Sequence, residues 1–131
     1  MPSALVCDVH PQVLYLVTFA LTAIGWEVFT TNEGKNIFDK VIECSPSLIL
    51  LDSDITEEGG VLTTQILKKL PASKDIPVIL FSSTGNVAEM AEEAGTEFYL
   101  SKPFDIKKLQ NMALLAYKCQ QSDSSEEEMS A

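Results

Sequence analysis

The sequence predicts an α/β fold, in which a parallel sheet of five strands carries helices on both faces. Short apolar, β-rich runs alternate with longer stretches of helical periodicity along the chain, and strict alternation of this kind is typical of parallel sheets. Residues 48–51 are apolar at every position, as expected of a strand that is buried on both faces. These two observations place the sheet between two layers of helices.

Each element follows from a local pattern. Five strands are predicted at about 4–8, 27–31, 48–52, 77–82 and 97–101, as β-rich runs bounded by turn residues. Five helices are predicted at about 11–24, 33–43, 60–70, 86–94 and 105–120. Pro11 suits a first helical turn, Gly25 and Gly95 suit helix ends, and Asp105 suits an N-cap.

Length and composition predict one domain with a tail. Residues 1–120 hold all the predicted elements, and a chain of 131 residues can bury one core. Residues 121–131 are rich in serine and glutamate, so we expect a disordered acidic tail or a linker there.

Charge and cysteine content restrict the expected partners and the expected cellular compartment. The net charge of −10 argues against direct contact with nucleic acid. Three cysteines cannot all pair, and no CxxC spacing or histidine cluster indicates zinc, which favours a reducing cytoplasm. The apolar segment 13–26 is too short to span a membrane and lacks the basic start of a signal peptide. The expected partners are therefore proteins, with no membrane or nucleic acid.

Four polar side chains stand where predicted strands end. Asp8 and Asp52 close the first and third strands, Ser82 closes the fourth, and Lys102 follows the fifth. Because the carboxyl ends of parallel strands meet at one edge, where ligands of such folds bind, we expect two carboxylates, a hydroxyl and an ammonium in one pocket. Such a pocket can hold a cation and a phosphoryl group.

Residues 4–120 resemble the receiver domain of two-component response regulators. The resemblance rests on LVCD at 5–8, PSLILLD at 46–52, PVILFS at 77–82 and YLSKPF at 99–104, with Gly59 or Gly60 where the family's loop carries glycine. It implies a flavodoxin-like sheet of strand order 2-1-3-4-5. It also implies a phosphoprotein of phosphorelay signal transduction.

The resemblance implies a role for each matched residue. Asp52 would be the phosphoacceptor, receiving its phosphoryl group from a histidine kinase or phosphotransfer protein, and Asp8 would help to hold Mg²⁺. Lys102 would pair with the phosphoryl oxygens, Ser82 would hydrogen-bond one of them, and Tyr99 would move inward with Ser82. These roles are chemically coherent, since a carboxylate attacks phosphorus poorly unless positive charge neutralises the transferring oxygens.

The metal site departs from the family pattern. Val9 stands where the family carries a second adjacent acid, which weakens the expected Mg²⁺ site. We expect Asp54, two residues after Asp52, to restore carboxylate charge beside the ion, because Mg²⁺ prefers oxygen ligands. His10 is the only histidine and is expected to be a residue of the helix start, not a ligand.

The first predicted helix is apolar nearly all round. A stripe with a period of 3.6 residues faces the sheet and leaves Leu14, Tyr15 and Phe19 on the outer side. Exposed apolar patches mark interaction sites. We therefore expect this face to contact a downstream protein partner or a second copy in a homodimer.

Two other functions fit parts of the sequence. Receivers that lose a metal-site acid can work as pseudo-receivers, which bind partners without being phosphorylated. Residues 50–56 also match the hhDxDxT signature of haloacid dehalogenase-like phosphatases, with Asp52 as nucleophile and Asp54 as acid and base. That signature normally lies near the N-terminus of a longer chain. The sequence thus favours a stand-alone receiver that signals by protein contact and is not an enzyme.

Overall fold

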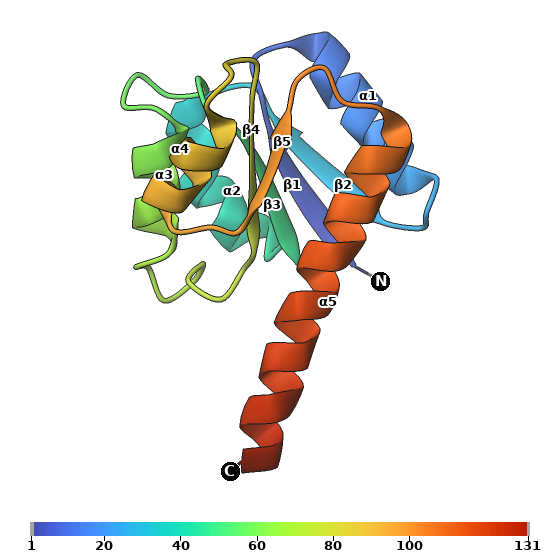
Figure 1. Cartoon of the computed structure of the whole chain (residues 1–131), viewed down its shortest axis with the longest axis vertical. Coiled ribbons are helices and arrows are strands. Elements are labelled where there is room, and N and C mark those ends of the chain that lie inside the picture. Colours follow the sequence, from blue (N-terminus) through green and yellow to red (C-terminus); the bar gives the residue numbers. More distant parts are fainter. Residues whose placement is uncertain (1, 131) are drawn as a thin grey trace.

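The computed structural model of the chain describes residues 2–130, with side chains described for residues 2–120. Five parallel strands form one sheet: β1 (Ser3–Cys7), β2 (Glu27–Thr31), β3 (Leu48–Asp52), β4 (Val78–Ser82) and β5 (Phe98–Ser101). Their order is β2-β1-β3-β4-β5 (Figure 1). This confirms the predicted flavodoxin-like arrangement.

Helices cover both faces of the sheet (Figure 1). One layer holds α1 (Pro11–Thr22) and α5 (Ile106–Ser130), and the other holds α2 (Ile37–Cys44), α3 (Gly60–Leu67) and α4 (Val87–Ala94). A short 3₁₀ turn, Gly34–Asn36, precedes α2. All five predicted helices are therefore present.

Two predicted helix signals are seen in the structure. The Asp105 Oδ1 atom accepts a hydrogen bond of 2.7 Å from the backbone N–H of Lys108, as an N-cap does. Gly95 ends α4 in the left-handed conformation, with φ 88°, which glycine adopts without steric strain. The expected tail at 121–131 lies outside the residues whose side chains are described, while the backbone of α5 is assigned through Ser130. Disorder there stays a prediction.

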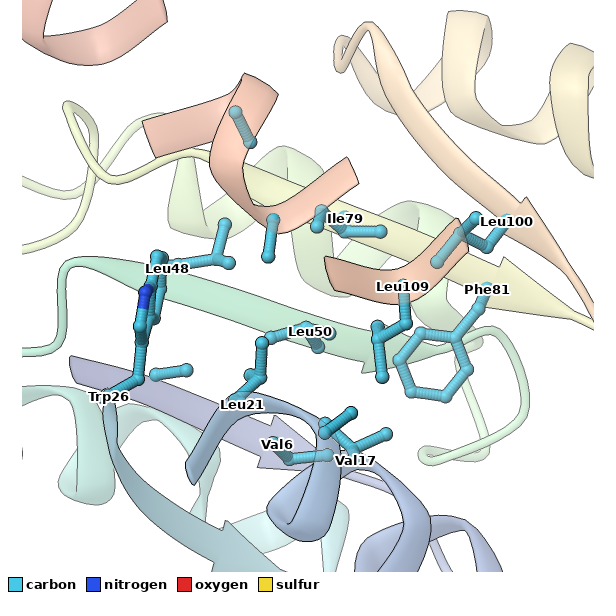
Figure 2. Packing of buried hydrophobic residues seen from close by; sticks show 14 of the residues in the cluster. Val6, Val17, Leu21, Trp26, Leu48, Leu50, Ile79, Phe81, Leu100 and Leu109 are labelled. Atoms are coloured by element: carbon cyan, nitrogen blue, oxygen red, sulfur yellow. The ribbon is translucent and has the colours of Figure 1, made fainter. Parts of the chain in front are cut away.

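Alternation within the strands builds two apolar cores. Even-numbered residues of β1 and β3, such as Val6 and Leu50, face α1 and α5, and odd-numbered residues, such as Leu5 and Ile49, face the other layer. Figure 2 shows the first core, where the β-strand residues meet side chains of the two helices. Every residue of β3 and β4 is buried. The groups at the edge of the sheet are therefore carried by strands that are packed on both faces.

The outer face of α1 is only partly as expected. Tyr15 and Phe19 are exposed, with 76% and 56% of their surface accessible. The expectation that Leu14 also points outward is wrong, because this residue is half-buried and packs against the first core. The reason is that α1 packs on α5 as well as on the sheet, so its buried stripe is wider than contact with the sheet alone requires.

Candidate functional site

The register of β1 and β3 brings two carboxylates together. Cys7 lies opposite Leu51 in the last matched pair of these neighbouring parallel strands. Asp8 and Asp52 come directly after that pair and share the face that carries Val6. Both are almost completely buried, Asp8 at 0% and Asp52 at 2% exposure. The fold thus delivers two acids to one point at the carboxyl edge of the sheet.

Lys102 binds both acids from the end of β5. Its backbone N–H donates to the Ser82 carbonyl at 2.8 Å, which ties it to β4. Its Nζ atom donates to Asp8 Oδ2 at 2.7 Å and to Asp52 Oδ1 at 3.1 Å, and it lies 5.2 Å from the centroid of the Phe81 ring. One ammonium therefore bridges the two carboxylates and takes one oxygen from each.

The electrostatic state of the pocket follows from these contacts. Burial raises the pKa of Asp52 above its ordinary value, the hydrogen bond from Lys102 opposes this rise, and the negative charge of Asp8 adds to it. Burial lowers the pKa of Lys102, but its bonds to the two acids outweigh burial and raise the pKa overall. Two carboxylates share one ammonium, so an added cation would relieve the remaining negative charge.

One oxygen of the pocket has no partner. The Asp52 Oδ2 atom is buried and forms no hydrogen bond within the described part of the chain. A buried carboxylate oxygen without a donor loses its hydration without compensation. This atom therefore keeps its acceptor capacity unused, which a cation or an electrophilic phosphorus atom could take up.

His10 lies in the same pocket. Its backbone N–H donates to Asp8 Oδ1 at 2.8 Å, and its ring Nδ1 atom lies 2.9 Å from the same oxygen. One ligand atom from each of Asp8, His10 and Asp52 lies within 4.8 Å of the others. The residues present fit a divalent cation, with two carboxylates and an imidazole as donors. His10 stands at the start of α1, as expected, and its ring also lies beside Asp8, which the sequence did not predict.

Asp54 does not join this cluster. Its side chain is exposed, and it is not among the three residues whose ligand atoms gather at the pocket. The neighbours Ser53 and Ile55 are buried at 2% and 6% exposure, so the loop turns them inward and leaves Asp54 in solvent. Asp54 is thus not one of the clustered ligand groups, although its negative charge is close enough to raise the pKa of Asp52.

Ser82 is held in a chain of hydroxyl groups. The Ser53 hydroxyl donates to Ser82 Oγ at 2.8 Å, and Ser82 Oγ lies 2.9 Å from Thr84 Oγ1. The Thr84 hydroxyl then contacts Asn86 Oδ1 at 2.6 Å, just before α4. Ser82 is fully buried, while Tyr99 on β5 is 40% exposed. Ser53 was missed in the sequence because Asp52 already marks the end of that strand and Ser53 is the first residue of the loop after it.

Gly60 allows the loop after β3 to pack against the backbone at the end of that strand. Its N–H donates to the Ser53 carbonyl at 2.7 Å. A Cβ atom at this position would lie 2.8 Å from Ser53 Cα and 3.1 Å from the Asp52 carbonyl oxygen. Only glycine fits so close to the backbone that carries Asp52.

Comparison with known protein families shows which family the chain belongs to. The response regulator receiver domain family matches residues 4–114. The chain belongs to the response regulator receiver domain family. Membership in this signalling family argues against the phosphatase alternative. Val9, the residue after Asp8, is 45% exposed and carries no charge.

Curated relatives are response regulators. The DNA-binding dual master transcriptional regulator RpaA of Synechocystis sp. is 28% identical over 111 residues, covering 83% of this chain and 46% of RpaA. The DNA-binding transcriptional regulator NtrC of Azospirillum brasilense is 32% identical over 105 residues, covering 80% of this chain and 22% of NtrC. This receiver thus spans less than half the length of these relatives.

Solved structures share the fold. The chemotaxis response regulator CheY4 of Vibrio cholerae aligns with a TM-score of 0.81 at 19% identity, over 88% of this chain and 98% of CheY4. NtrX of Brucella abortus aligns with a TM-score of 0.88 at 24% identity, over 98% of this chain and 30% of NtrX. Within the described residues, the receiver contains no helix with the length and apolar character needed to cross a bilayer.

Proposed function

We propose that this receiver accepts a phosphoryl group on Asp52 from a histidine kinase or a phosphotransfer protein, and then signals as a stand-alone domain through protein contacts. The observation that carries the proposal is the state of Asp52. One of its oxygens is bound by Lys102 at 3.1 Å, and the other is buried without a hydrogen-bond partner. Asp52 is thus oriented by an ammonium and keeps one free nucleophilic oxygen.

The transfer itself is a simple exchange at phosphorus. A carboxylate oxygen of Asp52 forms the new O–P bond while the P–N bond to the donor histidine breaks, and the histidine nitrogen keeps the electron pair of that bond. Lys102 is close enough to hydrogen-bond a transferring oxygen, which neutralises charge that gathers there. A divalent cation held by Asp8 and Asp52 would supply further neutralisation.

The proposed response to phosphorylation uses the hydroxyl chain. An acyl phosphate carries nearly two negative charges where the carboxylate carried one, and it brings several strong acceptors. Ser82 Oγ would leave the Ser53 and Thr84 hydroxyls and bond a phosphoryl oxygen instead. Because the hydroxyl hydrogen bonds continue through Thr84 to Asn86 at the start of α4, movement of Ser82 would change the loop before α4. Tyr99 would then move inward on β5.

Contact surfaces for partners lie close to the site. A cavity of about 290 Å³ between α1 and the segment after β5 is lined by Val13, Leu16 and Phe104 and reaches Lys102. An apolar surface beside Lys102 suits a protein that delivers a phosphoryl group. Tyr15 and Phe19 border a second hollow on the outer face of α1, which we assign to a downstream partner or a second copy. The three free cysteines support a cytoplasmic setting.

Labelling with a small phosphodonor tests the proposal. The purified domain is incubated with acetyl phosphate and either Mg²⁺ or Mn²⁺, and its intact mass is then measured. We expect one added phosphoryl group on the wild type and none on Asp52→Asn. Asp54→Asn is the matched control, because it removes a neighbouring but exposed carboxylate and should be labelled like the wild type.

The other functions predict different outcomes of the same experiment. A pseudo-receiver would stay unlabelled with both cations. A phosphatase would release phosphate continuously and would lose that activity in Asp54→Asn. Either result would replace the proposed function.

A further inference from the structure

We propose that His10 is a metal ligand and that the pocket prefers a divalent transition metal ion, such as Mn²⁺, to Mg²⁺. This inference deepens the proposed function, since it concerns the cation of the same phosphoacceptor site. It starts from Val9, which leaves the end of β1 with one carboxylate, and from the ring that stands beside that carboxylate.

The distances suit one ion bound by both residues. His10 Nδ1 and Asp8 Oδ1 are 2.9 Å apart. Donors about 2.1 Å from a metal at adjacent octahedral positions are about 3.0 Å apart. The same two atoms can therefore share a proton without the ion and become neighbouring ligands with it. Asp52 completes the set, because its ligand atom lies within 4.8 Å of both.

Lys102 leaves the matching oxygens available. Its ammonium occupies Asp8 Oδ2 and Asp52 Oδ1. The other oxygen of each acid is not bound by Lys102: Asp8 Oδ1 lies beside the imidazole, and Asp52 Oδ2 is buried and has no hydrogen-bond partner in the described part of the chain. The unsatisfied Asp52 Oδ2 atom points to a bound ligand, and this observation is independent of the clustering of the three residues. Lysine and metal can thus be bound together.

Donor chemistry sets the preference. Mg²⁺ is a hard ion that favours oxygen, whereas an imidazole nitrogen suits transition metals. A set of two carboxylates and one imidazole suits an ion that accepts both kinds of donor, as Mn²⁺ does. Mn²⁺ also binds thiolates weakly, so the exposed Cys119 should not compete with the pocket for this ion.

Electron paramagnetic resonance of the Mn²⁺-loaded full chain tests the inference. Titration measures affinity from the loss of the free-ion signal, and pulsed measurements detect nitrogen bound to the ion. His10 is the only histidine of the chain, so an imidazole signal can come from no other residue. We expect that signal in the wild type, and we expect Mg²⁺ to displace Mn²⁺ only when present in roughly tenfold excess or more.

Two variants at position 10 provide the controls. His10→Ala should lose the imidazole signal and bind Mn²⁺ roughly tenfold more weakly or worse. The His10 side chain is 61% exposed and caps no backbone group of α1, so the variant should fold, as circular dichroism can verify. His10→Asp supplies an oxygen donor instead and should shift the preference toward Mg²⁺.

The inference is overturned if the wild type shows no imidazole signal, if it does not bind Mn²⁺, or if His10→Ala binds Mn²⁺ as well as the wild type does. These results would leave the proposed function standing, provided that Asp52 is still labelled by acetyl phosphate with Mg²⁺. Conversely, an imidazole signal from a domain that cannot be labelled would support the metal site and reject phosphorylation.

Discussion

Replacing Gly60 with alanine should destabilise the receiver by a predictable amount. The added Cβ atom would lie 2.8 Å from Ser53 Cα, 3.0 Å from Leu80 Cδ1 and 3.1 Å from the Asp52 carbonyl oxygen. Two of these three atoms belong to the backbone at the end of β3, which cannot rotate away. Overpacking of this kind lowers the free energy of unfolding by about 1–3 kcal/mol.

A smaller effect acts in the opposite direction. Gly60 is the first residue of α3, and alanine favours a helix over glycine by up to about 1 kcal/mol. The expected net loss is therefore about 1–2 kcal/mol in the free energy of unfolding, measured by urea denaturation. Labelling of Asp52 should also slow, because the clash displaces the backbone that carries the carboxylate.

Gly85→Ala is the matched control for this prediction. No atom lies within 4 Å of a Cβ at Gly85, and its φ is not in the left-handed range. Its stability should stay the same or increase by up to about 1 kcal/mol, because alanine restricts the unfolded chain. A Gly60→Ala variant as stable as the wild type would refute the close packing of this loop on β3.

Four further tests concern other parts of the structure. Lys102→Met should lower the free energy of unfolding by about 3–5 kcal/mol, because two buried carboxylates lose their counter-charge. Adding Asp52→Asn to this variant should restore part of the lost stability, because one of the two unpaired charges is removed. A double variant no more stable than Lys102→Met would contradict the pairing of Lys102 with both acids. Since the pKa of Lys102 is raised, its contribution to stability should be complete below the ordinary lysine pKa and lost at more alkaline pH. A maleimide should label exposed Cys119 quickly but Cys7 only on unfolding, because burial raises the pKa of the Cys7 thiol; equal rates by mass spectrometry would disprove this protection. Phe19→Glu should weaken any self-association seen by sedimentation velocity without loss of stability, and an unchanged assembly would argue against a dimer through α1.

The sheet and the central acids were predictable because their signals are local. A strand buried on both faces is apolar at every position, and the acids of Asp8 and Asp52 follow such runs directly. Parallel pairing then leaves little choice in where these groups meet. The order of the strands, in contrast, came from the family resemblance and not from periodicity.

The sequence did not reveal the positions of side chains whose direction depends on loops or on neighbouring helices. Asp54 turns into solvent because Ser53 and Ile55 are the residues that the loop buries. The position of His10 depends on the turn that its own backbone makes with Asp8, which no periodicity reveals. Leu14 is covered because α1 also meets α5, a contact between elements far apart in the sequence.

Trp26, the only tryptophan, gives the receiver a built-in optical probe. Its indole is 5% exposed at the start of β2 and forms an edge-to-face pair with Tyr117 of α5, with ring centroids 5.4 Å apart. This contact lies at the opposite end of the sheet from Asp52. Fluorescence emission from Trp26 should therefore change when α5 loosens from the sheet, and it should not change when metal binding or phosphorylation affects only the acidic pocket. Loosening of α5 can thus be measured separately from changes in the pocket.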